Sequence, residues 1–312
     1  MTYIIGVDGG GTKTIGLLTD QDGHILARAE SGPSNYHAVG EAQTKKVLAD
    51  VISQLLTEVN ETLEGCTASN PGIQCAFCLG LAGVAAPIDQ KVIERICDEI
   101  GVPENRIVTH DARIGLVGGA DKLAGVIVIS GTGSIVYGMN TEGRETYAGG
   151  WGHLLGDEGS GYDIALCALR AVARAADERG SPTQLSDLML SALGLTQPRN
   201  LIPWIHGVSK DQVAQLAVDV FGVASAGDSI AQQILDNAAD ELTVAVHVVI
   251  DRLRFSQPFD VVLSGGILTH QPTFADLLRN RIETIVPTAR ICLPKHEPAY
   301  GAVILAKARF FK

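Results

Sequence analysis

Short apolar runs and longer segments with helical spacing alternate along the first third of the chain. The runs over Tyr3–Asp8, Thr14–Thr19 and His24–Glu30 are separated by Gly9-Gly10-Gly11 and by Asp22-Gly23. Asp-Gly between two apolar runs is a hairpin signal, and the glycine triplet can form the other turn. The pattern therefore predicts three consecutive strands joined by tight turns.

Helical and strand patterns then alternate. Apolar residues recur at helical spacing within Ala38–Leu63, which predicts a long helix. A buried strand is predicted over Ile73–Leu81, followed by a helix over Ile88–Ile100 and a strand over Arg106–His110. The order so far is strand, glycine turn, strand, strand, helix, strand, helix, strand.

The same order begins again in the second half of the chain. Three strands are predicted over Gly125–Ser130, Ser134–Met139 and Glu145–Ala148, with Gly131-Thr132-Gly133 between the first two. The later predicted elements are helices over Tyr162–Glu178, Asp211–Val223, Ser229–Phe255 and Ala299–Arg309, and strands over Phe259–Ser264 and Ala289–Leu293. This repetition of architecture predicts two βββαβαβ units that face each other across a cleft, with a boundary near Gly118-Gly119.

Length, charge and cysteine content narrow the classes of function. At about 150 residues per domain, 312 residues suggest two domains. The net charge of −11, with no basic block, argues against nucleic-acid and anionic-membrane partners. The longest apolar runs are strand-sized, and six cysteines do not look like a disulfide framework. We therefore expect a reduced, cytoplasmic protein without a membrane partner.

Asp8-Gly9-Gly10-Gly11-Thr12-Lys13-Thr14 is the strongest chemical motif. Its glycines allow the backbone to approach a phosphate closely and to point N–H groups at it. An acid at the end of a strand can hold Mg²⁺, usually through water. The alternative is an ordinary hairpin turn, but such a turn needs only one or two glycines. The motif is neither a Walker A loop nor a G-x-G-x-x-G fingerprint.

A second turn of small residues, Ser130-Gly131-Thr132-Gly133-Ser134, also follows an apolar strand. Alone it is weak evidence for phosphate binding. Because it corresponds to Asp8-Gly9-Gly10-Gly11-Thr12 in the repeated architecture, the two turns together predict a phosphate clamp with two jaws.

Asp111 follows the predicted strand Arg106–His110, at the point where a helix begins. Sites in α/β proteins commonly lie at the carboxyl ends of strands, and a carboxylate there can accept a proton from a substrate hydroxyl. The alternative is that Asp111 is only the N-cap of the helix.

The segment Gly149–Gly161 contains six glycines in thirteen residues. Ordering so many glycines costs conformational entropy, so a ligand-binding loop is favoured over a purely structural one. Trp151 offers an apolar face for a sugar ring, and Asp157 or Glu158 can accept hydrogen bonds from sugar hydroxyls. Asn35, in a polar loop after the third strand, could bind a hydroxyl or an amide, or simply belong to a turn.

Two further motifs have competing interpretations. Gly265-Gly266 closes the strand Phe259–Ser264 and could accept a flat adenine or ribose, or could serve tight packing alone. Cys75 and Cys78 form a Cys-x-x-Cys pair, but positions i and i+3 of a strand point to opposite faces. One such pair is also incomplete for zinc, so we interpret both residues as buried structural thiols.

Together and in this order, these motifs resemble those of the sugar-kinase/Hsp70/actin ATPase superfamily. Over its whole length the chain is similar to the N-acetylglucosamine kinases of the BadF/BadG/BcrA/BcrD ATPase family. The resemblance implies an α/β fold of two RNase H-like, actin-like ATPase domains with an interdomain cleft. It places the first domain at residues 1–118 with the helix 298–312 packed back on it, and the second, with a helical insertion, at residues 119–297. Arg106–Gly119 and Glu297–Ala306 would form the hinge, where Gly301 would permit a close helix contact.

The resemblance also implies the chemistry. It implies transfer of the γ-phosphate of ATP, with Mg²⁺, to the 6-hydroxyl of an amino sugar, N-acetylglucosamine first, by a homodimer. Asp111 becomes the catalytic base, and Asp8 holds Mg²⁺ through water. The implied sugar-binding residues are Asn35, Asp111, Ser134, Gly150, Trp151, Gly152 and Asp157. The implied ATP-binding residues are Gly10, Gly11, Thr12, Lys13, Gly131, Thr132, Gly133, Gly227, Gly265 and Gly266.

Other functions stay open at this point. Glucosamine, N-acetylmuramic acid and glucose are alternative sugars, because the sequence does not reveal the pocket around the 2-substituent. The same family includes iron–sulfur ATPase activators of acyl-CoA dehydratases and reductases, but the cysteines here offer no evident cluster site. A sugar-sensing regulator would normally carry a helix-turn-helix, whereas this chain begins with its first strand.

Overall fold

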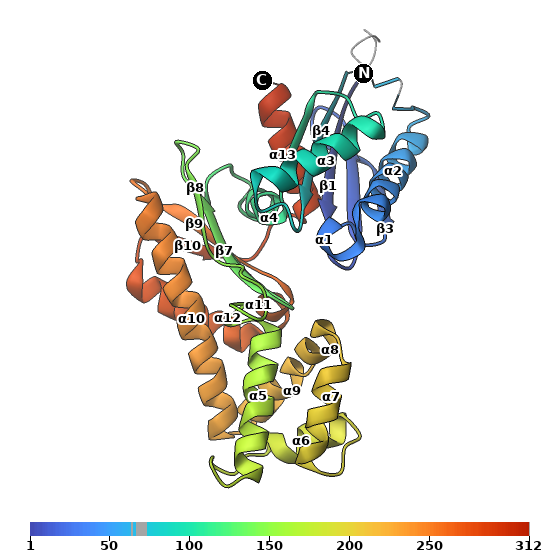
Figure 1. Ribbon diagram of the computed structural model, residues 1–312. Coiled ribbons are helices and arrows are strands. Elements are labelled where there is room, and N and C mark those ends of the chain that lie inside the picture. The colour runs from blue at the N-terminus through green and yellow to red at the C-terminus, as the bar shows by residue number, and fades with distance from the viewer. Residues whose placement is uncertain (64, 67–73, 312) are drawn as a thin grey trace. The chain divides into compact units, whose positions relative to one another are not determined.

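The computed structural model describes residues 1–63, 65–66 and 74–311, which fold into two compact units (Figure 1). The first unit is Met1–Gly125 with Pro294–Lys312, and the second is Val126–Leu293. Gly118-Gly119, where we expected a boundary, lies inside the helix α4 (Asp111–Ala120). The expected start of a strand at Ile73 lies outside the described residues.

The first unit is built on a five-stranded sheet of order β3-β2-β1-β4-β5. As predicted, the first three strands run antiparallel to their neighbours, whereas β4 and β5 are parallel to β1. The strands are β1 (Thr2–Gly9), β2 (Thr14–Thr19), β3 (Ile25–Ser31), β4 (Gln74–Leu81) and β5 (Arg106–His110). The carboxyl ends of β1, β4 and β5 therefore lie at one edge of the sheet.

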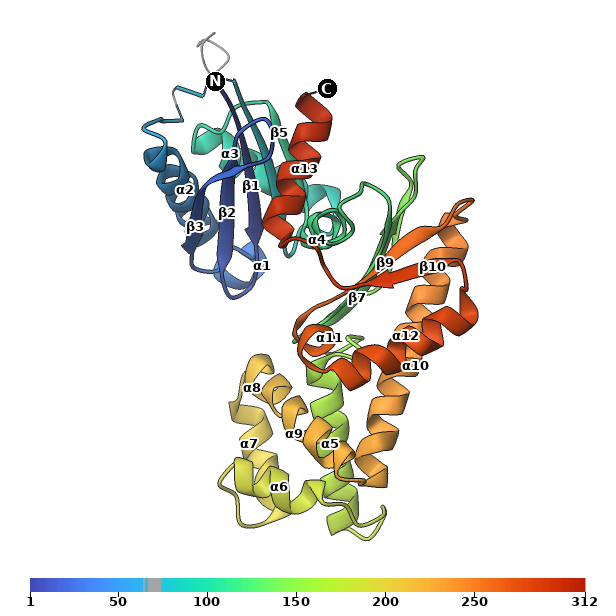
Figure 2. The ribbon, with the colours of Figure 1, turned by 180° about the vertical axis from the view of Figure 1, so that it is seen from behind.

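Helices cover both faces of this sheet (Figures 1 and 2). Because side chains alternate along a strand, Ile5 of β1 packs with α2 (Glu41–Glu58) and α3 (Pro87–Glu99), whereas Ile4 packs with α4 and α13 (Pro298–Phe310). The single helix expected over residues 38–63 was wrong in extent. Gly40, at φ +80°, separates α1 (Tyr36–Val39) from α2.

The C-terminal helix α13 approaches the backbone of the first unit very closely. A Cβ on Gly301 would lie 1.9 Å from the carbonyl oxygen of Ile114 in α4. A Cβ on Gly6 of β1 would lie 2.2 Å from the carbonyl oxygen of Ala299. Only glycine permits these approaches, so the last helix docks on the sheet that the first residues begin.

The second unit repeats the topology of the first. Its sheet has the order β10-β9-β6-β7-β8, which is the order of the first sheet when each unit is counted from its own first strand. The strands are β6 (Gly125–Ser130), β7 (Ser134–Met139), β8 (Glu145–Gly149), β9 (Phe259–Ser264) and β10 (Ala289–Cys292). The repetition predicted from the sequence is confirmed.

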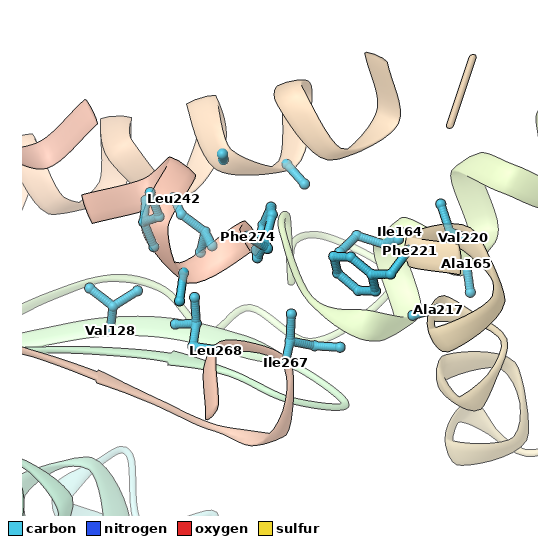
Figure 3. Packing of buried hydrophobic residues seen from close by; sticks show 14 of the residues in the cluster. Val128, Ile164, Ala165, Ala217, Val220, Phe221, Leu242, Ile267, Leu268 and Phe274 are labelled. Carbon is cyan, nitrogen blue, oxygen red and sulfur yellow. The ribbon is translucent and has the colours of Figure 1, made fainter. Parts of the chain in front are cut away.

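A continuous apolar core joins the helices of the second unit to its sheet. Figure 3 shows Leu242 and Phe274 from two helices beside Val128 of β6. The helix expected over residues 211–223 is two helices, α8 and α9. The helices are α5 (Gly161–Ala176), α6 (Leu185–Ala192), η1 (Pro198–Asn200), α7 (Leu201–Gly207), α8 (Lys210–Gln215), α9 (Ala217–Ser225), α10 (Ser229–Leu253), α11 (Gly266–His270) and α12 (Pro272–Ile285).

The cysteines of the first unit correct one expectation. Cys66 and Cys75 form a disulfide with a Cα–Cα distance of 5.3 Å, so Cys75 is not a free thiol and the expectation of fully reduced cysteines is wrong for this pair. The sequence concealed this pair because only the fold brings the segment after α2 to the start of β4. Cys78 is a buried free thiol on the opposite face of β4, as its spacing predicted, and burial raises its pKa to about 12.

Within the described residues, no single helix has the length and apolar character to cross a membrane. The stretch Lys210–Ser225 and the helix α10 meet the criterion of length and composition only as a pair, bent by 119°.

Candidate functional site

The first glycine turn is closed by its own backbone and holds the polar loop that follows β3. The Gly10 N–H donates to the carbonyl of Lys13 (2.9 Å). The Gly10 carbonyl accepts from the N–H groups of Ser34 (3.1 Å) and Asn35 (3.2 Å). Gly10, expected to bind ATP, therefore uses both backbone groups within the protein.

Exposed groups of the same turn are left for a ligand. Gly11, Thr12 and Lys13 are exposed, and no side chain or backbone atom lies within 4 Å of a Cβ built on Gly11. The Lys13 ammonium lies 3.6 Å from the Glu30 carboxylate on the surface. The N–H groups of residues 11 and 12 are thus the ones that this turn can offer to a phosphate.

Asn35 is fixed beside this turn. Its side-chain oxygen accepts the N–H of His37 (3.2 Å) and thereby caps the short helix α1. The hydroxyl of buried Ser34 accepts a hydrogen bond from Thr14 (2.7 Å), which anchors the loop to β2. The oxygen of Asn35 is therefore engaged in a turn, as the simpler interpretation expected, and its amide N–H₂ remains available to donate to a ligand.

Asp8 lies at the carboxyl end of β1, where burial is the main cause that raises its pKa from 3.8 to about 7. The negative charges of Asp111 and Glu297 raise it further, and Lys13 opposes them. Asp8 is consequently poised to gain or lose a proton near neutral pH. A cation would favour its charged form.

Asp111 is the first residue of α4 and not its cap. The cap is His110, whose ring nitrogen Nδ1 accepts the N–H of Arg113 (3.2 Å). One carboxylate oxygen of Asp111 accepts the N–H of Ala112 (2.8 Å). Burial raises the pKa of Asp111, while the charge of His110 and its backbone bonds lower it. The N-cap interpretation was therefore wrong, and the second carboxylate oxygen is not used by the cap.

Glu297 is a third acid of this group that sequence analysis named only as the start of a connecting segment. It precedes α13, and its carboxylate pairs with Arg28 of β3 at 3.3 Å. Its charge acts on Asp8 because α13 folds back on the first sheet. No sequence signal beyond Glu-Pro at the start of a helix indicates this position.

The second glycine turn, between β6 and β7, is also braced by backbone bonds. The Gly131 N–H donates to the Gly133 carbonyl (2.9 Å), and the Gly131 carbonyl accepts from Gly161 (2.8 Å). The hydroxyl of Ser130 donates to the carbonyl of Gly159 (2.7 Å). The glycine-rich loop therefore closes back on the turn, and Thr132 is left exposed at its tip.

Asp157 is the buried acid beneath this turn. One of its oxygens accepts the N–H of Ser134 (3.2 Å) and the other accepts the Lys210 ammonium (2.7 Å). Its backbone has φ +65°, a left-handed conformation that few residues other than glycine adopt. Lys210 was not identified from the sequence, because it lies in the helical insertion, 53 residues from Asp157.

The loop that carries the remaining sugar candidates depends on glycine backbone conformations. Gly149, Gly150 and Gly152 have φ between +74° and +77°. The hydroxyl of Ser134 donates to the carbonyl of Glu158 (2.7 Å). Trp151 is 69% exposed, so its ring is free to cover a ligand.

The pair Gly265-Gly266, predicted to accept adenine or ribose or to serve packing, lies beside the second turn. Gly265, at φ +89°, has no room for a side chain, because a Cβ would lie 2.3 Å from the carbonyl oxygen of Ser130. Gly266 has open space, and its N–H lies 3.6 Å from a Cβ built on Gly131. Gly265 is thus needed for tight packing, whereas Gly266 leaves space for a ligand.

Gly227 does not lie beside the second glycine turn or the pair Gly265-Gly266. It precedes α10, whose residues Ala238 and Leu242 are the ones that meet Gly159. At about 1.5 Å per residue, the 11 residues from Gly227 to Ala238 span roughly 16 Å along the helix. That Gly227 contacts the nucleotide therefore stays a prediction.

Comparisons with known proteins agree over the full length of the chain. The profile of the BadF/BadG/BcrA/BcrD ATPase family matches residues 5–306. The N-acetylmuramic acid/N-acetylglucosamine kinase of Clostridium acetobutylicum is 38% identical over 312 residues, 99% of each chain. The N-acetyl-D-glucosamine kinase of Dictyostelium discoideum is 37% identical over 309 residues, 97% of each chain. A crystal structure from Chromobacterium violaceum, provisionally named an N-acetylglucosamine kinase, has a TM-score of 0.76 at 27% identity, covering 97% of this chain and 98% of its own.

Proposed function

Because this chain belongs to the BadF/BadG/BcrA/BcrD ATPase family, we propose that it is an ATP-dependent kinase that phosphorylates the 6-hydroxyl of an amino sugar, N-acetylglucosamine first. One observation carries the proposal beyond the family. Asp111 lies at the carboxyl end of β5, and burial raises its pKa. Because His110 is the N-cap of α4, the Asp111 carboxylate does not serve as the cap. A carboxylate with a raised pKa is suited to accept a hydroxyl proton.

The reaction is a direct phosphoryl transfer. The Asp111 carboxylate accepts the proton of the sugar 6-hydroxyl. At the same time the sugar 6-oxygen forms a bond to the γ-phosphorus of ATP. The bond between that phosphorus and the β,γ-bridging oxygen breaks, and ADP leaves with the bonding electron pair. Backbone N–H groups of residues 11, 12, 132 and 133 stabilise the phosphate charge.

The acids of the first unit fit a divalent cation. Asp8 has its pKa raised to about 7 partly by Asp111 and Glu297, so three carboxylates repel one another there. A cation would relieve that repulsion, and carboxylate oxygens are the ligands that Mg²⁺ takes in kinases. Asp8 would hold Mg²⁺, through water, with Glu297 nearby. The bound ion would offset negative charge on the phosphate oxygens.

We assign the remaining positions as follows. The sugar-binding residues are Asn35, Asp111, Ser134, Gly150, Trp151, Gly152 and Asp157. The ATP-binding residues are Gly10, Gly11, Thr12, Lys13, Gly131, Thr132, Gly133, Gly227, Gly265 and Gly266. Gly10 and Gly131 act by shaping their turns, because their N–H groups are used within the protein.

A pocket of about 220 Å³ in the second unit supports binding of a small ligand there. The sugar candidates Ser134 and Trp151 line it together with Val136 and Leu242, so polar groups lie beside an apolar wall. The choice of N-acetylglucosamine itself rests on the relatives, one of which is named for both N-acetylmuramic acid and N-acetylglucosamine.

An ADP-release assay across four sugars tests the proposal. We expect N-acetylglucosamine to be the best substrate, with glucosamine, glucose and N-acetylmuramic acid slower. Phosphate on the 6-oxygen of the product, located by NMR, would support the assigned chemistry. ADP release that no hexose accelerates would count decisively against a kinase.

Cellular location, oligomeric state, partners and domain limits complete the proposal. We propose a cytoplasmic homodimer whose partners are an amino sugar and ATP, with no nucleic acid. We propose that the two functional domains are those predicted as residues 1–118 with 298–312 and residues 119–297, with ends that follow the two compact units. Light scattering and cell fractionation test the first two properties.

A further inference from the structure

Lys210 is a cation held against the second glycine turn by a buried acid. Its ammonium lies 2.7 Å from an oxygen of Asp157, whose side chain is 5% exposed. The Lys210 side chain itself is 31% exposed, so it lies at the surface of the unit and is not enclosed in the core. It begins α8, a helix of the insertion that packs on α5 (Figure 1). The pair therefore connects the insertion to the turn.

The distance to the turn is short. A Cβ built on Gly133 would lie 3.1 Å from the Lys210 ammonium and 3.0 Å from each oxygen of Asp157. Both charges are thus in contact with the backbone that we assign to phosphate binding. A carboxylate alone in this place would repel a phosphate, so the turn needs the adjacent cation to accept an anion.

Lys210 also has donors to spare. An ammonium carries three N–H groups, and one of them is directed at Asp157. Within the described part of the chain, the other two N–H groups have no hydrogen-bond acceptor. A fixed lysine with free donors beside exposed backbone N–H groups is an arrangement suited to phosphate oxygens.

We propose that Lys210 binds the phosphates of ATP at the second glycine turn, with Asp157 as the residue that holds its ammonium in place. The inference rests on the proposed function, because it takes ATP as the ligand. It adds a phosphate-binding residue that lies in the helical insertion. Neither glycine turn of the sequence indicates this residue.

Calorimetric titration of the full chain with ATP, ADP and adenosine tests the inference. K210M should weaken ATP and ADP binding by about tenfold or more, because a charge-assisted bond is lost. Adenosine, which has no phosphate, should bind K210M as it binds the unaltered chain. K210R keeps the positive charge and should lose less affinity. The matched control is K45M, which removes an exposed lysine from a 2.8 Å ion pair with Glu99 in the first unit and should change nothing.

The double variant D157N/K210M distinguishes two roles for Lys210. It could contact the phosphates directly, or it could only cancel the negative charge of Asp157, which the D157N substitution removes. Direct binding predicts that the double variant stays weak for ATP. Full recovery of ATP affinity would overturn the proposal, as would a K210M variant that binds ATP normally or loses adenosine equally. If the unaltered chain bound no ATP, the proposed function would fall with it, whereas normal ATP binding by K210M would overturn only this inference.

Discussion

At the scale of single residues, the acids of the first unit carry the chemistry. Asp8 and Asp111 were identified from the sequence because each follows an apolar strand directly. Glu297 was not, because its nearness to Asp8 depends on a helix that starts some 290 residues later in the chain. Burial raises the pKa of both aspartates, and for Asp8 the charges of Asp111 and Glu297 add to it; this is the environment of a proton acceptor.

The role of Asp111 as base predicts a specific kinetic defect. D111N should lower kcat by about 10²–10⁴-fold, because the amide cannot accept the hydroxyl proton. ATP affinity should stay close to normal and thermal stability should not fall, since His110 and not Asp111 caps α4 and burial already disfavours the Asp111 charge. D121N, at the exposed C-terminal cap of the same helix, is the matched control. Near-normal turnover of D111N would refute the assignment.

The raised pKa of Asp8 predicts a dependence of stability on pH in the absence of divalent cations. The folded protein holds this proton up to about pH 7, whereas an unfolded chain releases it near 3.8. The contribution of Asp8 to stability is therefore full below pH 4 and is lost as the pH rises to 7. Since a tenfold change in proton affinity is worth about 1.4 kcal/mol, the loss approaches roughly 4 kcal/mol.

Urea unfolding of the D8N variant at pH 4 and at pH 8 measures this effect. D8N should gain stability over the unaltered chain at pH 8 but not at pH 4. D22N, in the exposed turn between β2 and β3, should show no such difference. A D8N effect of equal size at both pH values would contradict the raised pKa.

At the scale of elements, close backbone contacts determine how α13 joins the first sheet. Gly301 meets Ile114 and Gly118 of α4 at distances that no Cβ could tolerate. The sequence indicated Gly301 as a contact glycine through its resemblance to a family. The same resemblance paired this segment with Arg106–Gly119, which contains most of α4, but no local pattern indicates the contact, because it spans nearly 190 residues of chain.

Adding a single methyl group at this contact should be costly. G301A should destabilise the protein by about 1–3 kcal/mol, because α13 must move away from the α4 backbone. G222A is the matched control, since Gly222 lies in α9 with nothing within 4 Å of its Cβ position. It should be neutral or stabilising by up to about 1 kcal/mol. Urea denaturation of both variants decides, and equal effects would contradict the packing argument.

At the scale of the whole molecule, the two units share a sheet topology but differ in continuity. The second unit is one stretch of chain, Val126–Leu293, whereas the first needs both ends. In the first unit, the apolar cluster on one face of the sheet joins Ile4 and Ala76 to Ala302 and Val303 of α13. Without α13 that face of the sheet would expose apolar side chains to water.

This difference predicts how fragments behave. A fragment of residues 126–293 should unfold cooperatively on heating, because it retains its whole core. A fragment of residues 1–125 should not, and adding a peptide of residues 294–312 should restore structure to it. Circular dichroism melts measure both, and cooperative unfolding of 1–125 alone would show that α13 is dispensable.

Periodicity and turn chemistry act over a few residues, so the strands, their repeated order and the two glycine turns could be predicted from the sequence. Asp8, Asp111 and Asp157 were found in the same way. Their partners became visible in the folded chain: Glu297 beside Asp8, His110 as the cap, Lys210 on Asp157, and Cys66 bonded to Cys75. Three of these depend on where packing places a segment that carries no local signal, whereas the His110 cap depends on the backbone geometry between β5 and α4. Contacts between distant segments arise from burial of a shared core, which no short stretch of sequence encodes.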